Sequence, residues 1–531
     1  MRTLWFEATL IFSLFSGEAQ LFAKAKPSFA NMQKNVLCQP SSVVRPMTEA
    51  ELQEAVQGAL RKGLPIKAAN QGWKGSNASS CVSPGGVQID TSGLDRILAV
   101  DTERNEVRVQ PGIKLWDFTQ ALHRDYQLTL TAVQEYADVT LGGMLGNSTH
   151  GSSLQEESSS LSDRIVALRV IDGQGEVREI RGKDLDYFGG HLGVLGIISE
   201  LTVKVQPSFK VKAAIAASPD THLEDEILPF VETHYAAAVT WFPGQSTYTT
   251  AAYDKVSQTL EGEAHNGQTE KPWLQRTLFP PIFKAAHLGN DNKLMCLLEN
   301  ERMKMKSQSF FTERYGNTVD PAIGWAHEML SFVCRDRCPF DALPYVLEEI
   351  AIPLEALPRF IEQAKTLFAQ KKVCLPLNGI YFRFGRASRG ALAMASGRDT
   401  AYVGMEYVRN PYGNHYPKDF EFIQELEQIL LKDYKGRPHW GKNAAAMFRT
   451  PEERYPRWDE FTAYRDQLDP QGIFKNEWFR TLQGELKSKA PTPNCVANEA
   501  CYCSADEHCP RTYSCQAGLI DPNVRVCRKH P

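Results

Sequence analysis

The sequence predicts an α+β protein made of two large parts and a small disulfide-rich tail. Its 531 residues exceed what one hydrophobic core usually supports, so two large domains are expected. Residues 87–90, 97–101 and 107–110 alternate apolar and polar side chains and are joined by turns without a long helix. This pattern favours an antiparallel or mixed sheet over a doubly wound parallel one. Six of the 12 cysteines crowd into residues 495–527, which predicts the tail.

Composition limits the class of partner. Hydrophobic residues make up 42% of the chain, charged residues 23%, and the formal net charge is -4. These values are ordinary for a globular protein and give no reason to expect nucleic acid or an anionic membrane as the main partner. No stretch after the N-terminus approaches the roughly 18 apolar residues that a membrane span needs. A small-molecule ligand is therefore expected.

The N-terminal residues 1–25 resemble a secretory signal peptide. Arg2 precedes an apolar run at residues 8–15, and small residues and Lys24 follow. Glu7 interrupts the pattern, and an ordinary buried N-terminal strand or helix is the alternative. We expect a protein that is secreted or resides in the lumen of the secretory pathway.

The cysteines are consistent with that compartment. An even, dense set in the tail predicts disulfides whose connectivity the sequence does not determine. A zinc module is the alternative, but the tail holds only His508 and His530 and lacks paired CxxC units. In the rest of the chain, one expected bridge joins Cys38 with Cys81. Cys334 and Cys338 could also pair locally.

The first large part, residues 38–210, begins with a helix. Thr48 is an N-cap with a Glu three residues on, apolar residues recur on one helical face, and Gly63 stops the pattern. A strand at 65–69 opens into a glycine-rich turn, and a second helix is expected over 114–124. Two strands then flank Asp172-Gly173-Gln174-Gly175, which is typical of a hairpin.

The second large part, residues 211–485, starts where the pattern changes after Pro207. Strands are expected at 350–353, 379–385 and 401–408. A helix over 358–370 should turn Phe360, Ala364 and Leu367 inward. A linker at 486–494 leads into the cysteine-rich tail, residues 495–531.

Three glycine-rich stretches, 70–77, 141–153 and 189–198, suggest a phosphate-bearing cofactor. Residues 141–153 hold four glycines and no formal charge, so main-chain N–H groups could approach a pyrophosphate closely. None of the stretches has the GxxxxGK[ST] order of a P-loop. None shows a GxGxxG that follows a strand into a helix, as a Rossmann turn requires.

These stretches carry a resemblance to a known family. With His191-Leu192-Gly193, Ile352-Pro353, Asn378-Gly379-Ile380 and His439-Trp440-Gly441-Lys442, they resemble the flavin oxidoreductases with the vanillyl-alcohol-oxidase type FAD domain, and within these the aldonolactone oxidases. The resemblance covers residues 45–484. The tail, with Cys501-Tyr502-Cys503, looks like that of plant L-gulonolactone oxidase-like proteins.

The resemblance implies both fold and activity. A two-part FAD-binding domain would be followed by an α+β substrate domain whose segment 439–484 returns to the flavin. Such a protein oxidises an aldono-1,4-lactone, here most readily L-gulono-1,4-lactone, to an ascorbate-type product and passes the electrons to O₂, giving H₂O₂. The implied FAD-binding residues are Asn70, Gln71, Gly72, Trp73, Lys74, Gly75, Pro111, Gly142, Gly143, Gly146, Asn147, Ser148, Thr149, His150, Gly193, Gly196, Ile197 and Ile198.

Two departures from the family pattern matter. Many relatives carry a His that is bonded covalently to the flavin at the position of Lys74, and no His lies in residues 70–80. We therefore predict that FAD is held non-covalently. Relatives often carry Glu-x-Arg on the strand that faces the flavin, where this chain has Tyr381-Phe382-Arg383. Tyr381 replaces a carboxylate that would bind sugar hydroxyls, which leaves the choice of substrate open.

The candidate catalytic residues are Lys442, Arg383, His439 and Tyr381, and no metal site is expected. Arg383 could stabilise the anionic reduced flavin or a substrate oxygen. Removing a hydride from an alcohol carbon leaves a proton on its oxygen, so a base or a cation is needed nearby. Lys442 is the first candidate for contact with the flavin or the substrate oxygen. His439 could orient the substrate or accept the proton, or could be a core histidine.

Pro111 lies where the family controls access of oxygen to the flavin, and a Pro there favours an oxidase over a dehydrogenase. Two alternatives stay open. One is a different carbohydrate or alditol oxidase or dehydrogenase on the same scaffold. The other is an extracellular binding protein whose tail recognises a wall or surface component and whose flavin domain is secondary.

Overall fold

A computed structural model gives the fold of most of the chain. The described residues are 29–31, 36–70, 77–131, 134–268, 281–282, 285, 292–313, 317–333, 345–371, 373–375, 379–408, 416, 419–443, 445–486, 491–497 and 501–530. The predictions for residues 1–25, 71–75, Asn378 and the pair Cys334 and Cys338 lie outside them. Within the described ranges, no helix is long and apolar enough to cross a membrane. The α+β class is confirmed.

The first part of the chain begins with a small parallel sheet. Its three strands run in the order β3 (Ser42–Val44), β5 (Val87–Asp90) and β4 (Ile66–Ala69). Helix α1 (Glu49–Arg61) packs its apolar face against this sheet. The predicted cap is present, because Thr48 Oγ1 accepts the Glu51 N–H at 3.2 Å. Two short strands, β1 (Phe29–Ala30) and β2 (Leu37–Cys38), pair ahead of it.

A second, antiparallel sheet of five strands completes this part. Its order is β10 (Val177–Ile180), β9 (Ile165–Ile171), β11 (Ile197–Lys204), β7 (Glu106–Val109) and β6 (Ile97–Asp101). The hairpin predicted around Asp172 joins β9 to β10. Helices α2 (Leu115–Tyr126) and α3 (Leu141–Gly146) share a hydrophobic core with this sheet. The short strands β8 (Leu128–Thr129) and β12 (Gln206–Pro207) pair beside it. The expected mixture of strand directions is confirmed, although 87–90 belongs to the parallel sheet.

The second part is built on one eight-stranded sheet. Its order is β18 (Ala322–Trp325), β13 (Lys210–Pro219), β15 (Thr247–Val256), β14 (Ala236–Phe242), β20 (Ile380–Gly385), β21 (Thr400–Val408), β19 (Tyr345–Pro353) and β22 (Arg437–Pro438). Helices α4 (Leu223–Thr233), α8 (Leu357–Gln370) and α9 (Phe420–Lys432) pack on one face through alternate strand residues such as Val239 and Phe382. The inward residues predicted for α8 are buried. The other face of the sheet is left for the site.

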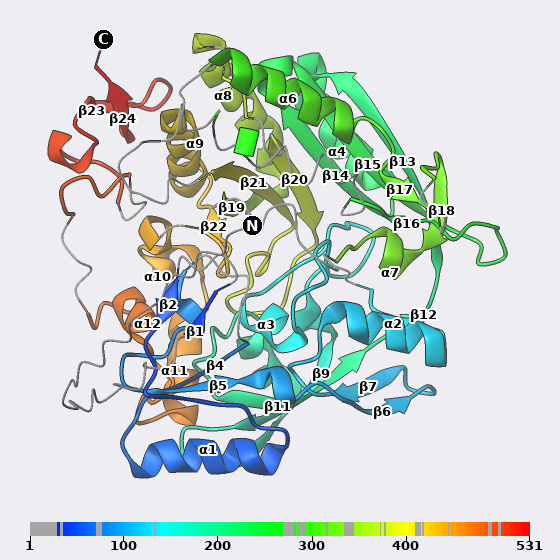
Figure 1. Cartoon of the computed structure of the whole chain (residues 1–531), viewed down its shortest axis with the longest axis vertical. Coiled ribbons are helices and arrows are strands. Elements are labelled where there is room, and N and C mark those ends of the chain that lie inside the picture. The colour runs from blue at the N-terminus through cyan, green and yellow to red at the C-terminus, as the bar shows by residue number, and fades with distance from the viewer. Residues whose placement is uncertain are drawn as a thin grey trace, which may run out of the picture.

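Further elements border that other face. They are α6 (Asn292–Lys306), α7 (Ala326–Met329), β16 (His265–Asn266) and β17 (Phe311–Thr312). Figure 1 shows the eight-stranded sheet and its helices above the first part. After β22 the chain returns downward to the first part. This returning segment carries α10 (Pro451–Arg454), α11 (Trp458–Leu468) and α12 (Glu477–Leu482). Phe474 packs with α1, and Trp440 packs in the core of the antiparallel sheet.

Disulfides hold the tail and parts of the body. The predicted bridge between Cys38 and Cys81 is present, with an S–S distance of 2.05 Å. A bridge that was not predicted joins Cys296 to Cys374. In the tail the pairs are Cys495 with Cys501, Cys503 with Cys515, and Cys509 with Cys527. These pairs leave no tail thiolate for zinc, so the disulfide interpretation is confirmed. The tail hairpin, β23 (Tyr513–Ala517) and β24 (Arg525–Lys529), packs on α9.

Candidate active site

A cavity of about 470 Å³ lies between the two parts of the chain. This volume falls within the range of about 300–1,000 Å³ that is usual for ligand pockets. The predicted residues on its wall are Asn70, Pro111, Gly142, Gly143, Gly146, Asn147, Thr149, Gly193, Gly196, Ile197, Ile198, Tyr381, Arg383, His439 and Lys442. The structure therefore brings the glycine-rich stretches and the four candidate catalytic residues to one cavity.

Seven predicted cofactor residues are not on the described wall. Gln71, Gly72, Trp73, Lys74 and Gly75 lie outside the described residues. Ser148 and His150 are described and are buried behind the cavity. Ser148 adopts a left-handed conformation with a φ of 53°, at the point where the chain turns away from α3.

One end of the cavity is formed by glycine backbone. Gly142 packs directly on Pro111, where an added Cβ would come within 2.8 Å of the proline Cβ. A Cβ at Gly143 would meet only Thr140 Oγ1, at 3.1 Å, so the remaining space beside it belongs to the cavity. Gly196 has a φ of 114°, and a Cβ there would collide with Ile171 O at 2.6 Å. Only glycine allows the main chain to line this end so closely.

Lys67 on β4, which the sequence did not single out, holds one of these loops in place. Its Nζ donates to Leu192 O at 2.6 Å and to Gly193 O at 3.2 Å. Burial lowers the pKa of Lys67 to about 7, although the nearby carboxylate of Asp469 favours its charge. The lysine thus ties the first sheet to the loop that follows His191.

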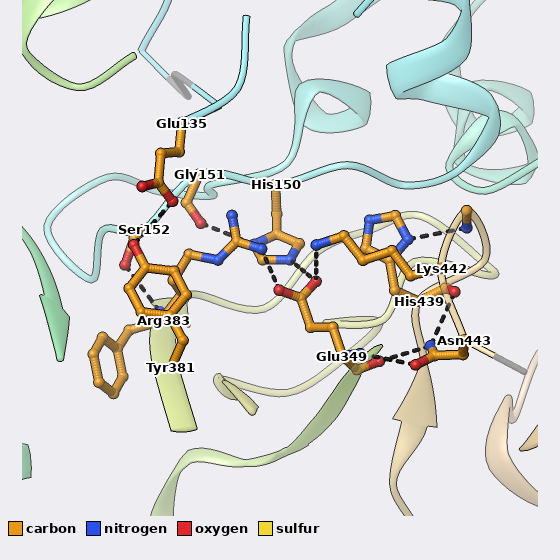
Figure 2. A network of polar contacts seen from close by, with 12 residues as sticks. Glu135, His150, Gly151, Ser152, Glu349, Tyr381, Arg383, His439, Lys442 and Asn443 are labelled. Carbon is orange, nitrogen blue, oxygen red and sulfur yellow. Dashed lines mark hydrogen bonds and ion pairs between the residues drawn. The ribbon is translucent and has the colours of Figure 1, made fainter. Parts of the chain in front are cut away.

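The other end of the cavity is organised around Glu349 on β19. Its Oε1 lies 3.2 Å from Lys442 Nζ and 3.0 Å from His150 Nε2, and its Oε2 is paired with the guanidinium of Arg383 (Figure 2). Burial opposes the charge of this carboxylate. The two cations outweigh burial and hold the pKa of Glu349 well below its ordinary range.

Strand register explains why these side chains meet. Tyr381 on β20 and Glu349 on β19 both lie opposite Gly404 on the strand between them. Because side chains alternate along a strand, Tyr381, Arg383 and Glu349 share the sheet face that α4, α8 and α9 leave uncovered. Gly404 has no side chain and lines the cavity, so it leaves a floor between its two neighbours.

His150 supports Glu349 from behind. Its ring stacks on Tyr402 with centroids 3.4 Å apart and planes 11° apart. Its two nitrogens lie 2.8 Å from Gly151 O and 3.0 Å from the Glu349 carboxylate. His150 can therefore orient the carboxylate of Glu349, and it does not itself line the cavity.

His439 and Lys442 share one turn, in which the Lys442 N–H donates to His439 O at 3.0 Å. The Gly441 N–H donates to His439 Nδ1 at 3.0 Å, which leaves the ring proton on Nε2. Burial, with the adjacent Lys442 cation, holds the pKa of His439 well below its ordinary value, so the ring is neutral. Burial also lowers the pKa of Lys442, and Glu349 partly opposes this effect.

Asn443 fixes this turn to β19. Its Oδ1 accepts the Glu349 N–H at 2.8 Å, and its Nδ2 donates to Glu349 O at 2.9 Å. Figure 2 shows the two residues joined in this way below the Lys442 side chain. The segment that returns from the second part is thereby held in register with the carboxylate.

Other charged residues on the wall were not anticipated. Tyr381 donates its hydroxyl hydrogen to Glu135 Oε2 at 2.9 Å. The Glu135 carboxylate therefore lies beside Tyr381, the residue found here in place of the Glu that relatives often carry. Glu406 on β21 also lines the cavity, and Arg302 and Lys306 reach it from α6. A signal for Glu349 existed in the sequence, because charged residues inside the apolar run at 345–353 are uncommon in a buried strand.

Two family models match the chain. The FAD binding domain family matches residues 40–181. The D-arabinono-1,4-lactone oxidase family matches residues 201–482, just over half of the chain. The chain belongs to the D-arabinono-1,4-lactone oxidase family. It is thus an FAD-dependent oxidoreductase of the aldonolactone oxidase and dehydrogenase group.

Individual relatives agree with this placement. "Probable L-gulonolactone oxidase 1" of Arabidopsis thaliana is 27% identical over 94% of this chain and 90% of its own length. The "L-gulono-1,4-lactone dehydrogenase" of Mycobacterium tuberculosis is 28% identical over 86% of this chain and 99% of its own length. Among solved structures, a "Solvent-stable cholesterol oxidase" shares the fold with a TM-score of 0.69 and 16% identity, covering 86% of this chain and 97% of that one.

Proposed function

We propose that the protein oxidises an aldono-1,4-lactone, most readily L-gulono-1,4-lactone, to an ascorbate-type product while O₂ is reduced to H₂O₂. The observation that carries this proposal is the pairing of Glu349 with Lys442 and Arg383 in a cavity whose other end is lined by glycine backbone. The substrate loses one C–H hydrogen and one O–H hydrogen, and both hydrogens and the two electrons leave with the peroxide.

The residues on the wall fit FAD. Gly142, Gly143, Gly193 and Gly196 let main-chain groups lie beside a pyrophosphate, and the Lys67 amine lies behind them. The cations Arg383 and Lys442 stand at the far end. Bound FAD supplies the two-electron chemistry, with O₂ as the final acceptor. The protein residues have to orient the substrate and receive its proton.

Arg383 and Lys442 serve different purposes in this scheme. Glu349 outweighs burial and raises the pKa of Arg383 above its ordinary value, so Arg383 is a fixed positive charge. It stabilises negative charge that develops on the reacting partners. Burial lowers the pKa of Lys442, although Glu349 partly opposes this effect, so a larger share of its amine than in an exposed lysine is neutral and can take the hydroxyl proton of the substrate.

His439 is an orienting donor in this scheme. Its Nδ1 already accepts the Gly441 N–H, and its Nε2 therefore carries the proton and can donate to a substrate oxygen. A ring nitrogen of His439 and a carboxylate oxygen of Glu349 lie within 4.8 Å of each other. Of the two tasks considered from the sequence, orientation fits this geometry better than proton acceptance.

The charges around the substrate favour a neutral polyhydroxyl compound. Arg302 and Lys306 face the carboxylates Glu135 and Glu406, so this part of the wall mixes both signs. Hydroxyl groups can donate to carboxylates and accept from cations, whereas the carboxylate of an open sugar acid would be repelled by Glu135 and Glu406. A lactone suits this wall better than its open acid.

An anaerobic assay tests the proposal. The flavin should bleach with L-gulono-1,4-lactone faster than with alditols, aldoses or the open acid, and admitting air should yield H₂O₂. Bleaching without peroxide would point to a dehydrogenase, as in the name of the Mycobacterium tuberculosis relative. Bleaching by another sugar or alditol alone would favour the alternative oxidase. A flavin that no compound reduces would leave the binding protein as the better account.

We also propose entry into the secretory pathway, which the disulfides among the described residues support. Expression in a eukaryotic host with and without residues 1–25 tests this. Only the full chain should appear in the medium, with its N-terminus cleaved. Retention of the uncleaved full chain in the cytosol would contradict the proposal.

A further inference from the structure

A second, smaller cavity of about 60 Å³ adjoins the first on the same side of the eight-stranded sheet. Glu135, Lys306, Tyr381 and Arg383 belong to the walls of both cavities. From Tyr381 the second cavity extends over β14 and β15, away from the glycine-lined end. A compound that reacts beside Arg383 would reach the second cavity past Tyr381 and its partner Glu135.

Small side chains create this hollow. Thr240 on β14 lies opposite Tyr381 on β20 and opposite Thr249 on β15. Two residues away along β14, Ala238 lies opposite Ala251. Large side chains thus stand on β20, and small side chains lie beside them at positions 238, 240, 249 and 251, while Tyr235, Tyr253 and Phe310 complete the wall. Since all of these residues line the cavity, larger side chains at the alanine positions would fill it.

Hydroxyl groups line the hollow. Thr131 Oγ1 is buried and makes no hydrogen bond to the described residues. Thr240 and Thr249 are also buried and place two further hydroxyl-bearing side chains on the same wall. Buried polar groups are normally satisfied, so an unpartnered hydroxyl beside a cavity indicates a polar occupant. Glu156, the carboxylate at the far side, is already paired with Arg164 and Lys255.

We propose that this second cavity is the subsite for the exocyclic diol chain of the lactone substrate. The inference rests on the proposed function. A cavity of about 60 Å³ exceeds several times the 10–15 Å³ that one water requires, so it takes a few heavy atoms and no second sugar ring. The two-carbon diol chain of a six-carbon 1,4-lactone has that size and that chemistry. The subsite would make the enzyme prefer six-carbon lactones to five-carbon lactones.

The test compares L-gulono-1,4-lactone with the five-carbon lactone of the same ring configuration, which carries a single hydroxymethyl group. Wild-type kcat/KM should favour the longer lactone by about 10- to 100-fold. Ala251→Leu narrows the cavity, so this ratio should fall towards one while kcat/KM for the shorter lactone stays within about twofold. Thr240→Val, which removes one hydroxyl at nearly constant volume, should raise KM for the longer lactone alone.

Ala214→Leu is the matched control. Ala214 is exposed on β13, outside both cavities, and should leave the ratio unchanged. The absorbance of bound flavin shows whether each variant folds. Equal kcat/KM for the two lactones in the wild type, or an equal loss for both in Ala251→Leu, would overturn the subsite and leave lactone oxidation standing. If no lactone reduces the wild-type flavin, the proposed function fails, and the subsite fails with it.

Discussion

Lys442 Nζ lies 3.2 Å from Glu349 Oε1, and this contact joins the segment 439–484 to strand β19 of the eight-stranded sheet. Both residues line the cavity, and Arg383 pairs with the other carboxylate oxygen. The buried carboxylate of Glu349 therefore favours the protonated form of Lys442 and pairs with the permanent positive charge of Arg383. The consequences of this arrangement can be measured separately for each partner.

Replacing Glu349 by Gln should cost about 3–5 kcal/mol of stability, because it leaves Arg383 and Lys442 as buried cations without a counterion. Flavin reduction should slow as well. Glu348→Gln is the matched control, since Glu348 lies on the opposite face of the same strand and burial raises its pKa well above the ordinary value. Thermal unfolding and stopped-flow reduction measure both effects. Equal behaviour of the two variants would remove Glu349 from its assigned place.

Lys442→Met should slow flavin reduction by about 10²- to 10⁴-fold, because the variant lacks the amine that receives the substrate proton. Bound flavin and the melting temperature should change far less, since Glu349 keeps Arg383 and His150 as partners. Stopped-flow absorbance at the flavin band measures the rate. An unchanged rate would show that another group takes the proton.

The rate of flavin reduction should rise with pH and level off below the ordinary lysine pKa of 10.5. Burial lowers the pKa of Lys442, so its neutral, proton-accepting form appears earlier than in an exposed lysine. In Lys442→Met this rise should disappear. A wild-type rate that falls as pH increases through this range would contradict the assignment.

Lys67 should make the protein more stable as pH rises from about 7 to 10.5. Its pKa in the folded protein is lowered to about 7, so the unfolded chain binds the additional proton across this window. The free energy of unfolding should increase by up to about 1.4 kcal/mol per pH unit relative to Lys67→Met. Lys62→Met, at an exposed position, should retain the wild-type dependence. Parallel curves for wild type and Lys67→Met would refute this.

Acid precipitation should release yellow FAD into the supernatant, because the residue at the family attachment position is Lys74. His191 and His439 line the cavity, but the Nδ1 atom of each accepts a glycine N–H and is therefore already engaged in a hydrogen bond within the protein. Fluorescence of the denatured chain on a gel after acid treatment is the measurement. A fluorescent band would show a covalent bond.

Local signals in the sequence were sufficient for much of the fold. Thr48 caps α1, alternate apolar residues bury one face of α8, and Cys38 bonds to Cys81 as expected. The glycine stretches and the His439 to Lys442 turn could be assigned to one site because together they resemble the motifs of a known flavoprotein family. These features depend on neighbours within a few residues or on chemistry that few residue types provide.

The tertiary structure decided which carboxylates serve the site. Glu349 meets a histidine 199 positions away, and Tyr381 meets Glu135 across 246 positions. Sheet order and register create both contacts, and no local pattern encodes either. For the same reason His150 could be assigned to the cofactor from its loop, whereas its stacking on Tyr402 turns it towards Glu349. The sequence alone determined the family and the cations Arg383 and Lys442, whereas packing determined the carboxylates that control them and brought Lys67, Arg302 and Lys306 to the same cavity.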